Sequence, residues 1–186
     1  MNKIRLATQE DAGFIRDIYS PYVLNTPVSF ETEVPSIGEI RNRIRDTLIK
    51  FPWLVFETNN SVVGYSYAGP HRSRCAYSWS VESTVYVHPE FQGKGIGTLL
   101  YRTLFELIKS QGVVNIYAGI VLPNNPSVKL HERVGFTSIG VFKDIGYKLD
   151  RWWDVGWWQL QLQKPIHPDA LAEPVKIFEI LEPRIP

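Results

Sequence analysis

Residues 85–98 constrain the fold of this chain more than any other stretch, because they predict a strand, a glycine loop and a helix in direct succession. Residues 85–87 are β-branched or aromatic, as is typical of a strand, and three glycines alternate with other residues in 93–97. Apolar residues then recur at helical spacing through 96–108. Glycines let backbone N–H groups approach a ligand, and a helix start adds unpaired donors. We therefore expect residues 92–98 to bind a phosphate or pyrophosphate.

The composition predicts a single globular domain. Of 186 residues, 44% are hydrophobic and 21% charged, which is enough for a full apolar core. The net charge of +1 gives no signature of nucleic acid or membrane binding. Cys75 is the only cysteine, which excludes an internal disulfide and a cysteine-based metal cluster, and we expect no metal. We expect a cytoplasmic protein, since no signal-peptide core and no membrane-spanning apolar run is visible.

The order of the predicted elements indicates a mixed α/β (α+β) domain in which three strands run consecutively. Two capping-box patterns, Thr8 with Asp11 and Ser36 with Glu39, mark helix starts, and Pro21 is expected to distort or end the first helix. We expect strands at 4–6, 53–57, 62–67, 77–88, 113–120, 136–141 and 152–160, and helices at 14–22, 37–48, 96–111 and 128–134.

The connections are predicted from turn residues. Asn59-Asn60 indicates a hairpin turn, Ser127 is expected to cap the fourth helix, and residues 144–150 are expected to form a loop. We divide the chain into a domain, 1–163, and a proline-rich extended arm, 164–186, which packs on the domain or on a dimer partner.

Three phosphate-binding motifs compete for the glycine loop. A Walker loop requires Ser or Thr directly after its lysine, and Lys94 is followed by Gly95. A dinucleotide fingerprint requires a carboxylate about 20 residues later, and the chain has no Asp or Glu between Glu106 and Glu132. The third pattern is Gln92-x-x-Gly95-x-Gly97 after a strand, and a plain strand-to-helix turn is the alternative to all three.

This third pattern resembles the coenzyme A loop of the GNAT superfamily of N-acetyltransferases. Asn124-x-x-Ser127 followed by residues 130–136, which end in Gly-Phe, is similar to the second signature of that superfamily. Further segments resemble the phosphinothricin N-acetyltransferases, so that the resemblance covers about residues 3–180: Asn25-Thr26, Tyr67-Ala68-Gly69-Pro70, Val81-Glu82-Ser83-Thr84-Val85-Tyr86-Val87, Leu122-Pro123-Asn124 and Asp154-Val155-Gly156.

The resemblance implies an acyl-CoA N-acyltransferase fold, which is a splayed, mixed, largely antiparallel sheet flanked by helices. Acetyl-CoA would lie between the strands at 82–87 and 113–120, with its pyrophosphate on the glycine loop and its pantetheine arm along the first strand. The implied cofactor-binding residues are Val85, Tyr86, Val87, Gln92, Gly93, Lys94, Gly95, Ile96, Gly97, Thr98, Asn124 and Ser127. Val85 and Val87 serve equally well as ordinary core residues.

The implied reaction is direct acetyl transfer to an amine, which needs a base because α-amines are largely protonated near neutral pH. Glu82 is the candidate, acting directly or through water, and partial burial in its apolar strand would strengthen it as a base. A surface carboxylate is the alternative. The backbone N–H of Val85 or Tyr86 would stabilise the oxyanion. His131 stands where many members have Tyr, so it could be the acid, a second base or a packed helix residue.

The implied acceptor is phosphinothricin, methionine sulfoximine or methionine sulfone, whose carboxylate and acceptor-rich side chain need cations and donors. The implied acceptor site consists of Phe30, Arg72, Arg74, Tyr77, Glu82, Ser83 and Thr84. A solvated basic loop is the alternative for the two arginines. Another small amine or amino acid is the alternative acceptor, and an acetyl-CoA sensor without chemistry is disfavoured by Glu82 and His131. The family also implies a homodimer that involves the 25–34 loop.

Overall fold

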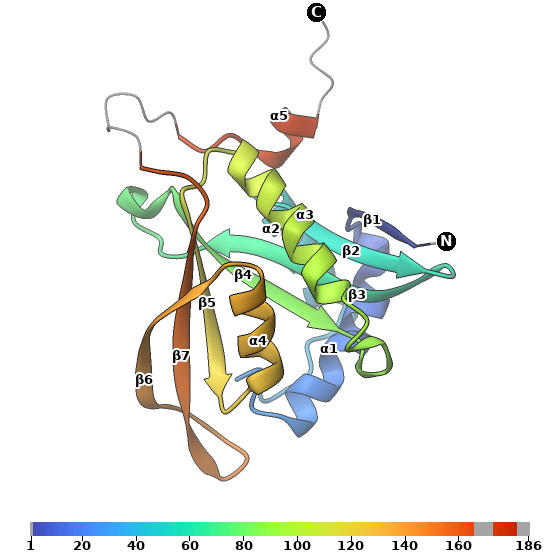
Figure 1. The fold of residues 1–186 in the computed structure, drawn as a ribbon. Coiled ribbons are helices and arrows are strands. Elements are labelled where there is room, and N and C mark those ends of the chain that lie inside the picture. The colour runs from blue at the N-terminus through green and yellow to red at the C-terminus, as the bar shows by residue number, and fades with distance from the viewer. Residues whose placement is uncertain (1, 166–172, 182–186) are drawn as a thin grey trace, which may run out of the picture.

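The computed structural model describes residues 2–165 and 173–181, and Figure 1 shows a seven-stranded sheet with helices on both faces. The strand order is β1-β2-β3-β4-β5-β7-β6, and every neighbouring pair is antiparallel except β4 with β5. The strands are β1 (Lys3–Leu6), β2 (Trp53–Thr58), β3 (Ser61–Pro70), β4 (Ser80–Val87), β5 (Asn115–Leu122), β6 (Thr137–Lys148) and β7 (Arg151–Gln161). The α-helices are α1 (Ala12–Asn25), α2 (Ile37–Leu48), α3 (Ile96–Ser110), α4 (Asn125–Arg133) and α5 (Ile177–Leu181).

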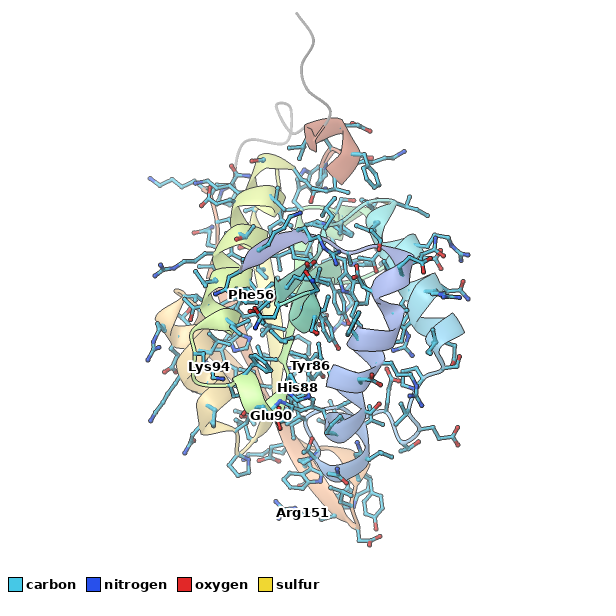
Figure 2. All side chains as sticks on the ribbon, turned by 90° about the vertical axis from the view of Figure 1, so that its right-hand side faces the viewer. Phe56, Tyr86, His88, Glu90, Lys94 and Arg151 are labelled. Atoms are coloured by element: carbon cyan, nitrogen blue, oxygen red, sulfur yellow. The ribbon has the colours of Figure 1, made fainter. Side chains whose placement is uncertain are left out.

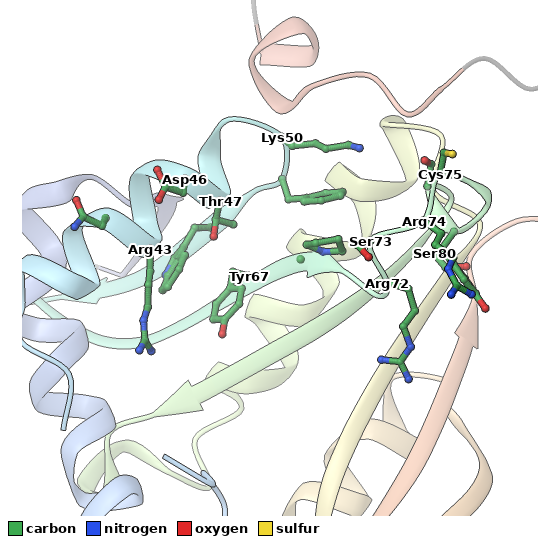
Figure 3. A pocket seen from close by; sticks show the side chains of 17 residues that line it. Arg43, Asp46, Thr47, Lys50, Tyr67, Arg72, Ser73, Arg74, Cys75 and Ser80 are labelled. Atoms are coloured by element: carbon green, nitrogen blue, oxygen red, sulfur yellow. The ribbon is translucent and has the colours of Figure 1, made fainter. Parts of the chain in front are cut away.

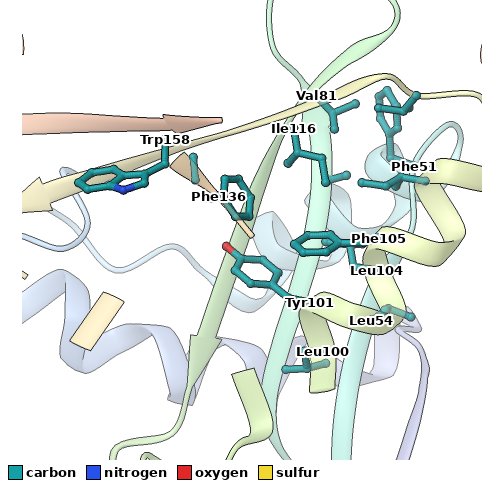
Figure 4. Packing of buried hydrophobic residues seen from close by; sticks show 14 of the residues in the cluster. Phe51, Leu54, Val81, Leu100, Tyr101, Leu104, Phe105, Ile116, Phe136 and Trp158 are labelled. Carbon is teal, nitrogen blue, oxygen red and sulfur yellow. The ribbon is translucent and has the colours of Figure 1, made fainter. Parts of the chain in front are cut away.

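The two faces of the sheet are covered by different helices, as the alternation along β2 shows. Leu54 and Phe56 belong to the apolar cluster under α3, whereas Trp53 and Val55 belong to the cluster with α1 and α2. This follows from the two-residue period of a strand, which sends successive side chains to opposite faces. Figure 4 shows the α3 cluster, in which aromatic rings from α3, β7 and the segment after α4 gather.

The sheet splays between β4 and β5. These two parallel strands pair only at Ser80 with Asn115, Val81 with Ile116, and Glu82 with Tyr117. Beyond these residues the strands diverge, as Figure 1 shows. Residues 83–87 and 118–122 therefore do not pair with each other, and we call the region between these two diverging segments the β4–β5 wedge. The predicted separation of these strands is confirmed.

Several local predictions are confirmed at the expected residues. In the α2 capping box, the Ser36 backbone N–H donates to Glu39 Oε2 over 2.7 Å, and the Glu39 N–H donates to Ser36 Oγ over 3.2 Å. Asn59 and Asn60 have φ values of 50° and 61°, as a tight hairpin turn requires. These features depend on neighbouring residues only, which is why the sequence predicts them.

Other local predictions were wrong. The helix α1 continues through Pro21 to Asn25, residues 77–79 lie outside β4, and 144–148 belong to β6. A short 3-10 helix at Cys75–Tyr77 precedes β4, and the expected loop shortens to a turn at Leu149 and Asp150. For β6, contacts with a distant strand override the local pattern, because Gly146, Tyr147 and Lys148 pair with β7 beyond an irregularity after Phe142.

Part of the C-terminal arm packs on the domain. Gln111 Nε2 at the end of α3 donates to the carbonyls of Lys50 and Val175 over 2.6 and 2.7 Å. The Val175 N–H donates to the Gln111 carbonyl over 3.0 Å, and Ile177 is fully buried. The arm was expected to be an extended segment rather than a domain, and its described part includes the short helix α5. Residues 166–172 and 182–186 of the expected arm lie outside the described residues.

Candidate active site

The glycine loop delivers the start of α3 to the edge of the β4–β5 wedge. Gly95 is the N-cap of α3 and has a φ of 81°, a left-handed conformation that glycine adopts without a steric penalty. The first bond of the helix runs from the Leu99 N–H to the Gly95 carbonyl over 3.1 Å. The N–H groups of residues 96–98 thus precede the intrahelical ladder and can donate to an anion. Lys94, His88 and Glu90 lie around the end of β4 in Figure 2.

Gly97 has a packing role beside its expected binding role. A Cβ atom at Gly97 would lie 3.0 Å from Leu130 Cδ2, so a larger residue here would push the Leu130 side chain aside where α3 and α4 approach closely. This contact brings the second signature segment, on α4, next to the glycine loop. The two segments that the sequence separates by about thirty residues therefore border the same wedge.

Gln92 is held by a tyrosine that sequence reasoning missed. Its side-chain Nε2 donates to Tyr22 Oη over 2.6 Å, and the Tyr22 hydroxyl donates to the Val87 carbonyl over 2.6 Å. Tyr22 lies on α1, 65 residues before Val87, so no local signal could have revealed this link. The link joins the end of β4 to the beginning of the glycine loop.

One backbone edge of β4 faces the wedge, while its side chains pack against helices on the two faces of the sheet. Val85 and Val87 pack against the α3 cluster, and Tyr86 makes edge contacts with Tyr19 and Tyr22 of α1 at 5.0 Å between ring centroids. The other edge of β4 is fully paired with β3. The backbone groups of residues 83–87 that face β5 have no strand partner, so a ligand can pair with them as an added strand.

Asn124, rather than Ser127, caps α4, which corrects the prediction for this helix. Asn124 Oδ1 accepts from the Ser127 N–H over 3.2 Å. Ser127 lies inside the first turn, because the preceding Pro126 occupies an early helical position that needs no N–H donor. The Asn124 side chain is therefore already engaged in the fold.

His131 is the buried end of a hydrogen-bonded chain. Its Nδ1 lies 2.7 Å from the Ser127 carbonyl, which can only accept, so Nδ1 carries the proton and Nε2 accepts from the Tyr101 hydroxyl at 2.9 Å. Ser83 Oγ of β4 donates to Tyr101 Oη over 3.5 Å. Burial lowers the pKa of His131 below its ordinary value of 6.5 and raises the pKa of Tyr101. At neutral pH His131 is therefore uncharged and has no spare proton to donate.

Glu82 lies at the vertex of the wedge, in the last residue pair that joins β4 to β5. Its side chain is 38% exposed, which agrees with the partial burial expected from the sequence. Its Oε1 lies 2.9 Å from His71 Nδ1 and 4.0 Å from Arg72 Nη1. Sequence reasoning missed His71, which comes directly after β3 and reaches Glu82 only because β3 and β4 are paired.

A cavity of about 680 Å³ lies beside β3, between α2 and the loop that follows β3. Figure 3 shows Tyr67 between Arg43 and Arg72 in this cavity. The charged residues of the lining are four cations and one carboxylate, namely Arg43, Lys50, Arg72, Arg74 and Asp46. Tyr77 also contributes, so three of the expected acceptor residues are brought together here.

The remaining expected acceptor residues lie elsewhere. Thr84 borders a neighbouring small cavity of about 80 Å³, whereas Ser83 points to the opposite face, toward Tyr101. Phe30 borders neither cavity, and its ring packs over Gly146 of β6. The loop that carries Phe30 is held by Lys148, whose Nζ donates to the carbonyls of Val23 and Ser29 over 2.6 Å.

Neither a metal site nor a membrane span is found among residues 2–165 and 173–181. No group of three or more His, Cys, Asp or Glu side chains in this part of the chain could hold a metal ion. No helix there is both long and apolar enough to cross a bilayer.

Comparisons with known proteins agree with this geometry. The family model described as an acetyltransferase (GNAT) domain matches residues 4–157. The phosphinothricin N-acetyltransferase of Streptomyces viridochromogenes is 41% identical over 89% of this chain and 91% of its own. An L-methionine sulfoximine/L-methionine sulfone acetyltransferase of Salmonella typhimurium is 36% identical over 90% and 98%. The crystal structure of a phosphinothricin acetyltransferase from Sinorhizobium meliloti with acetyl-CoA superposes with a TM-score of 0.84, at 33% identity over 91% and 97%.

Proposed function

The chain belongs to the GNAT family of acetyltransferases and is an acetyl-CoA-dependent N-acetyltransferase, and from this we propose that it acetylates the α-amino group of phosphinothricin-like amino acids. Phosphinothricin, methionine sulfoximine and methionine sulfone form the proposed acceptor class. The observation that carries the proposal is the position of Glu82, which lies in the last β4–β5 residue pair at the wedge and 4.0 Å from Arg72, a residue of the cationic cavity. Its α/β fold, with a splayed and mostly antiparallel sheet, is the fold of its structural relatives.

The residues of the wedge fit acetyl-CoA, which supplies the activated acetyl group. The N–H groups of residues 96–98 and the backbone of Gly93, Lys94 and Gly95 would hold its pyrophosphate. The free edge of residues 85–87 would pair with the pantetheine arm. Gln92, Asn124 and Ser127 would contribute by fixing the conformation of the glycine loop and of α4. The side chains of Gln92 and Asn124 already form hydrogen bonds within the protein.

Glu82 would serve the removal of a proton from the attacking amine, either by accepting it, directly or through water, or by acting through a neighbouring side chain. The N–H of Val85 or Tyr86 would stabilise negative charge on the carbonyl oxygen. We propose that His131 holds the Tyr101 hydroxyl in place toward β4 rather than acting as a charged acid. Replacement of Glu82 by Gln should lower kcat/KM at neutral pH, and by less at high pH, where the free amine is already deprotonated.

Arg72, Arg74 and Tyr77 would bind the carboxylate and the side-chain oxygens of the acceptor, because guanidinium groups form paired hydrogen bonds with oxyanions. Thr84 would contribute from the neighbouring small cavity, whereas Phe30 and Ser83 line neither cavity and are proposed from the family resemblance alone. Another small amine or amino acid as acceptor is the alternative, and no contact of the described residues favours it over the phosphinothricin class.

We also propose a homodimer. β6 is exposed along nearly all of its length and carries a row of large apolar side chains, which is unusual for a sheet edge that faces water. The large apolar residues that are exposed on the β6–β7 hairpin are Ile139, Val141, Phe142, Ile145, Tyr147, Leu149 and Trp152. Sedimentation that yields only a 21.4 kDa species would contradict the dimer. The cytoplasmic location stays a prediction.

The decisive test is thiol release from acetyl-CoA with each of the three acceptors. The expected result is acceptor-dependent release that Glu82→Gln abolishes or strongly reduces. Release with none of them, by a protein that binds acetyl-CoA, would overturn the proposed acceptor class. Release with an unrelated amine alone would establish the alternative.

A further inference from the structure

His71 lies over the vertex of the wedge and is fixed on several sides. Its ring stacks on Tyr117 of β5 at 4.6 Å between centroids and an interplanar angle of 26°. Tyr77 and Trp157 meet the ring edge-on at 5.9 and 6.2 Å. Only 16% of the His71 side chain is exposed. This degree of confinement exceeds what a residue of a solvated loop requires, and it fixes the plane of the imidazole.

The contact with Glu82 sets the protonation of the ring. An ionised carboxylate can only accept a hydrogen bond, so the 2.9 Å contact between Glu82 Oε1 and His71 Nδ1 places a proton on Nδ1. In the neutral imidazole Nε2 then carries the lone pair. Within the described part of the chain, no side chain or backbone group forms a hydrogen bond with Nε2. The carboxylate thus binds one nitrogen of the imidazole and leaves the other nitrogen without a partner among the described residues. The Asp and His of a Ser-His-Asp triad have the same arrangement.

Charged and aromatic side chains surround this imidazole. The charged partner of His71 is Glu82 on β4, and Arg72 lies on the solvent side, 4.0 Å from Glu82. The other neighbours of His71 are aromatic, namely Tyr77, Tyr117 and Trp157. The negative charge of Glu82 would stabilise the imidazolium that forms on proton uptake. A carboxylate ordinarily binds a proton near about pH 4, whereas imidazole does so near about pH 6.5. Imidazole is therefore the better matched base for an ammonium group at neutral pH.

We propose that His71 is the catalytic base of this enzyme and that Glu82 acts through it. The inference rests on the proposed acetyl transfer to an amine. His71 Nε2 takes the proton of the acceptor ammonium: the N–H bond of the ammonium breaks, an Nε2–H bond forms, and the electron pair left on the amine nitrogen attacks the acetyl carbonyl. Glu82 holds the Nδ1–H tautomer and balances the charge of the imidazolium. As the new N–C bond forms and the C–S bond to coenzyme A breaks, the amide nitrogen loses its second proton to the departing thiolate, and the first proton leaves Nε2 to solvent.

Two substitutions separate this role from structural ones. His71→Asn keeps a donor near Nδ1 for Glu82 but has no second nitrogen, and His71→Phe keeps the ring stack but has neither nitrogen. Loss of a general base costs about 10²- to 10⁴-fold in rate, so both variants should lose kcat/KM by that factor while binding acetyl-CoA as the wild type does. Near-normal activity of the Asn variant would show that His71 only orients Glu82, and near-normal activity of the Phe variant would show that it only packs.

The pH profile gives a readout that packing does not move. Wild-type kcat/KM should rise with pH across the range where imidazole loses its proton, and both variants should lack this rise. Because Glu82 and His71 act as one unit, Glu82→Gln combined with His71→Asn should lose little more than His71→Asn alone. Full additivity of the two losses would overturn the proposal.

A measurement without acceptor keeps this proposal separate from the proposed function. Nitrogen NMR of labelled enzyme, with the His71 signals assigned by their loss in His71→Asn, should show a protonated Nδ1 and an unprotonated Nε2 above neutral pH. A proton on Nε2 instead would overturn the base assignment, whatever the acceptor. Absence of thiol release with all three acceptors overturns the proposed function, and the tautomer then decides this proposal independently.

Discussion

Replacing Tyr22 by Phe should weaken acetyl-CoA binding although Tyr22 lies on α1, outside the glycine loop. The hydroxyl donates to Val87 at the end of β4 and accepts from Gln92 at the start of the loop, both over 2.6 Å. A net contribution of about 0.5–1.5 kcal/mol per hydrogen bond gives about 1–3 kcal/mol for the pair. If about 1–2 kcal/mol of this holds the loop in its binding conformation, the Kd for acetyl-CoA should rise about 5- to 30-fold.

The assay is calorimetric titration with acetyl-CoA, and Tyr19→Phe is the matched control. Tyr19 lies on the same helix, and its hydroxyl bonds to Ser29 Oγ over 2.5 Å, with no contact to the glycine loop. The control should lose thermal stability but keep its Kd within about twofold of the wild type. An unchanged Kd for Tyr22→Phe, or an equal rise for both variants, would refute the idea that the Tyr22 hydroxyl organises the loop.

Three further outcomes are expected. In Gly146→Ala the new Cβ would overlap the ring of Phe30, so the ring must move, and the KM for the acceptor should rise in steady-state kinetics while the Kd for acetyl-CoA stays constant. Asn124→Ala removes the cap of α4 and should cost about 0.5–2 kcal/mol, which lowers Tm by about 1–8 °C in calorimetry. Burial alone would raise the pKa of Asp11, but the Arg5 guanidinium, which contacts it at 2.7 Å, holds that pKa below its ordinary value of 3.8. Because the folded-state pKa is the lower one, the stabilisation is fully present above pH 3.8 and is lost as the pH falls through the folded value. Urea unfolding should therefore show a smaller loss of stability below pH 3.8 in Asp11→Asn than in the wild type.

The elements that the sequence predicted well are those whose signals are local. The α2 capping box, the Asn59-Asn60 turn and the glycine N-cap of α3 each depend on a few consecutive residues, and the structure contains all three. Predictions failed where a distant strand or helix decided the conformation. α1 continues past Pro21 because its last turn is tied to β4 by Tyr22, and β6 extends through 144–148 because β7 pairs with it.

The sequence by itself indicated the cofactor side of the proposed site, because the glycine loop and the segment after Asn124 are continuous stretches whose pattern can be read locally. It also indicated Glu82 as the carboxylate at the centre of the site. Only the tertiary structure decided what Glu82 touches. Strand pairing brings His71 to Glu82, and helix packing brings Tyr101 to His131. These partners lie 11 and 30 residues apart, and contacts over such separations arise from the register of strands and the packing of helices, which no short pattern encodes.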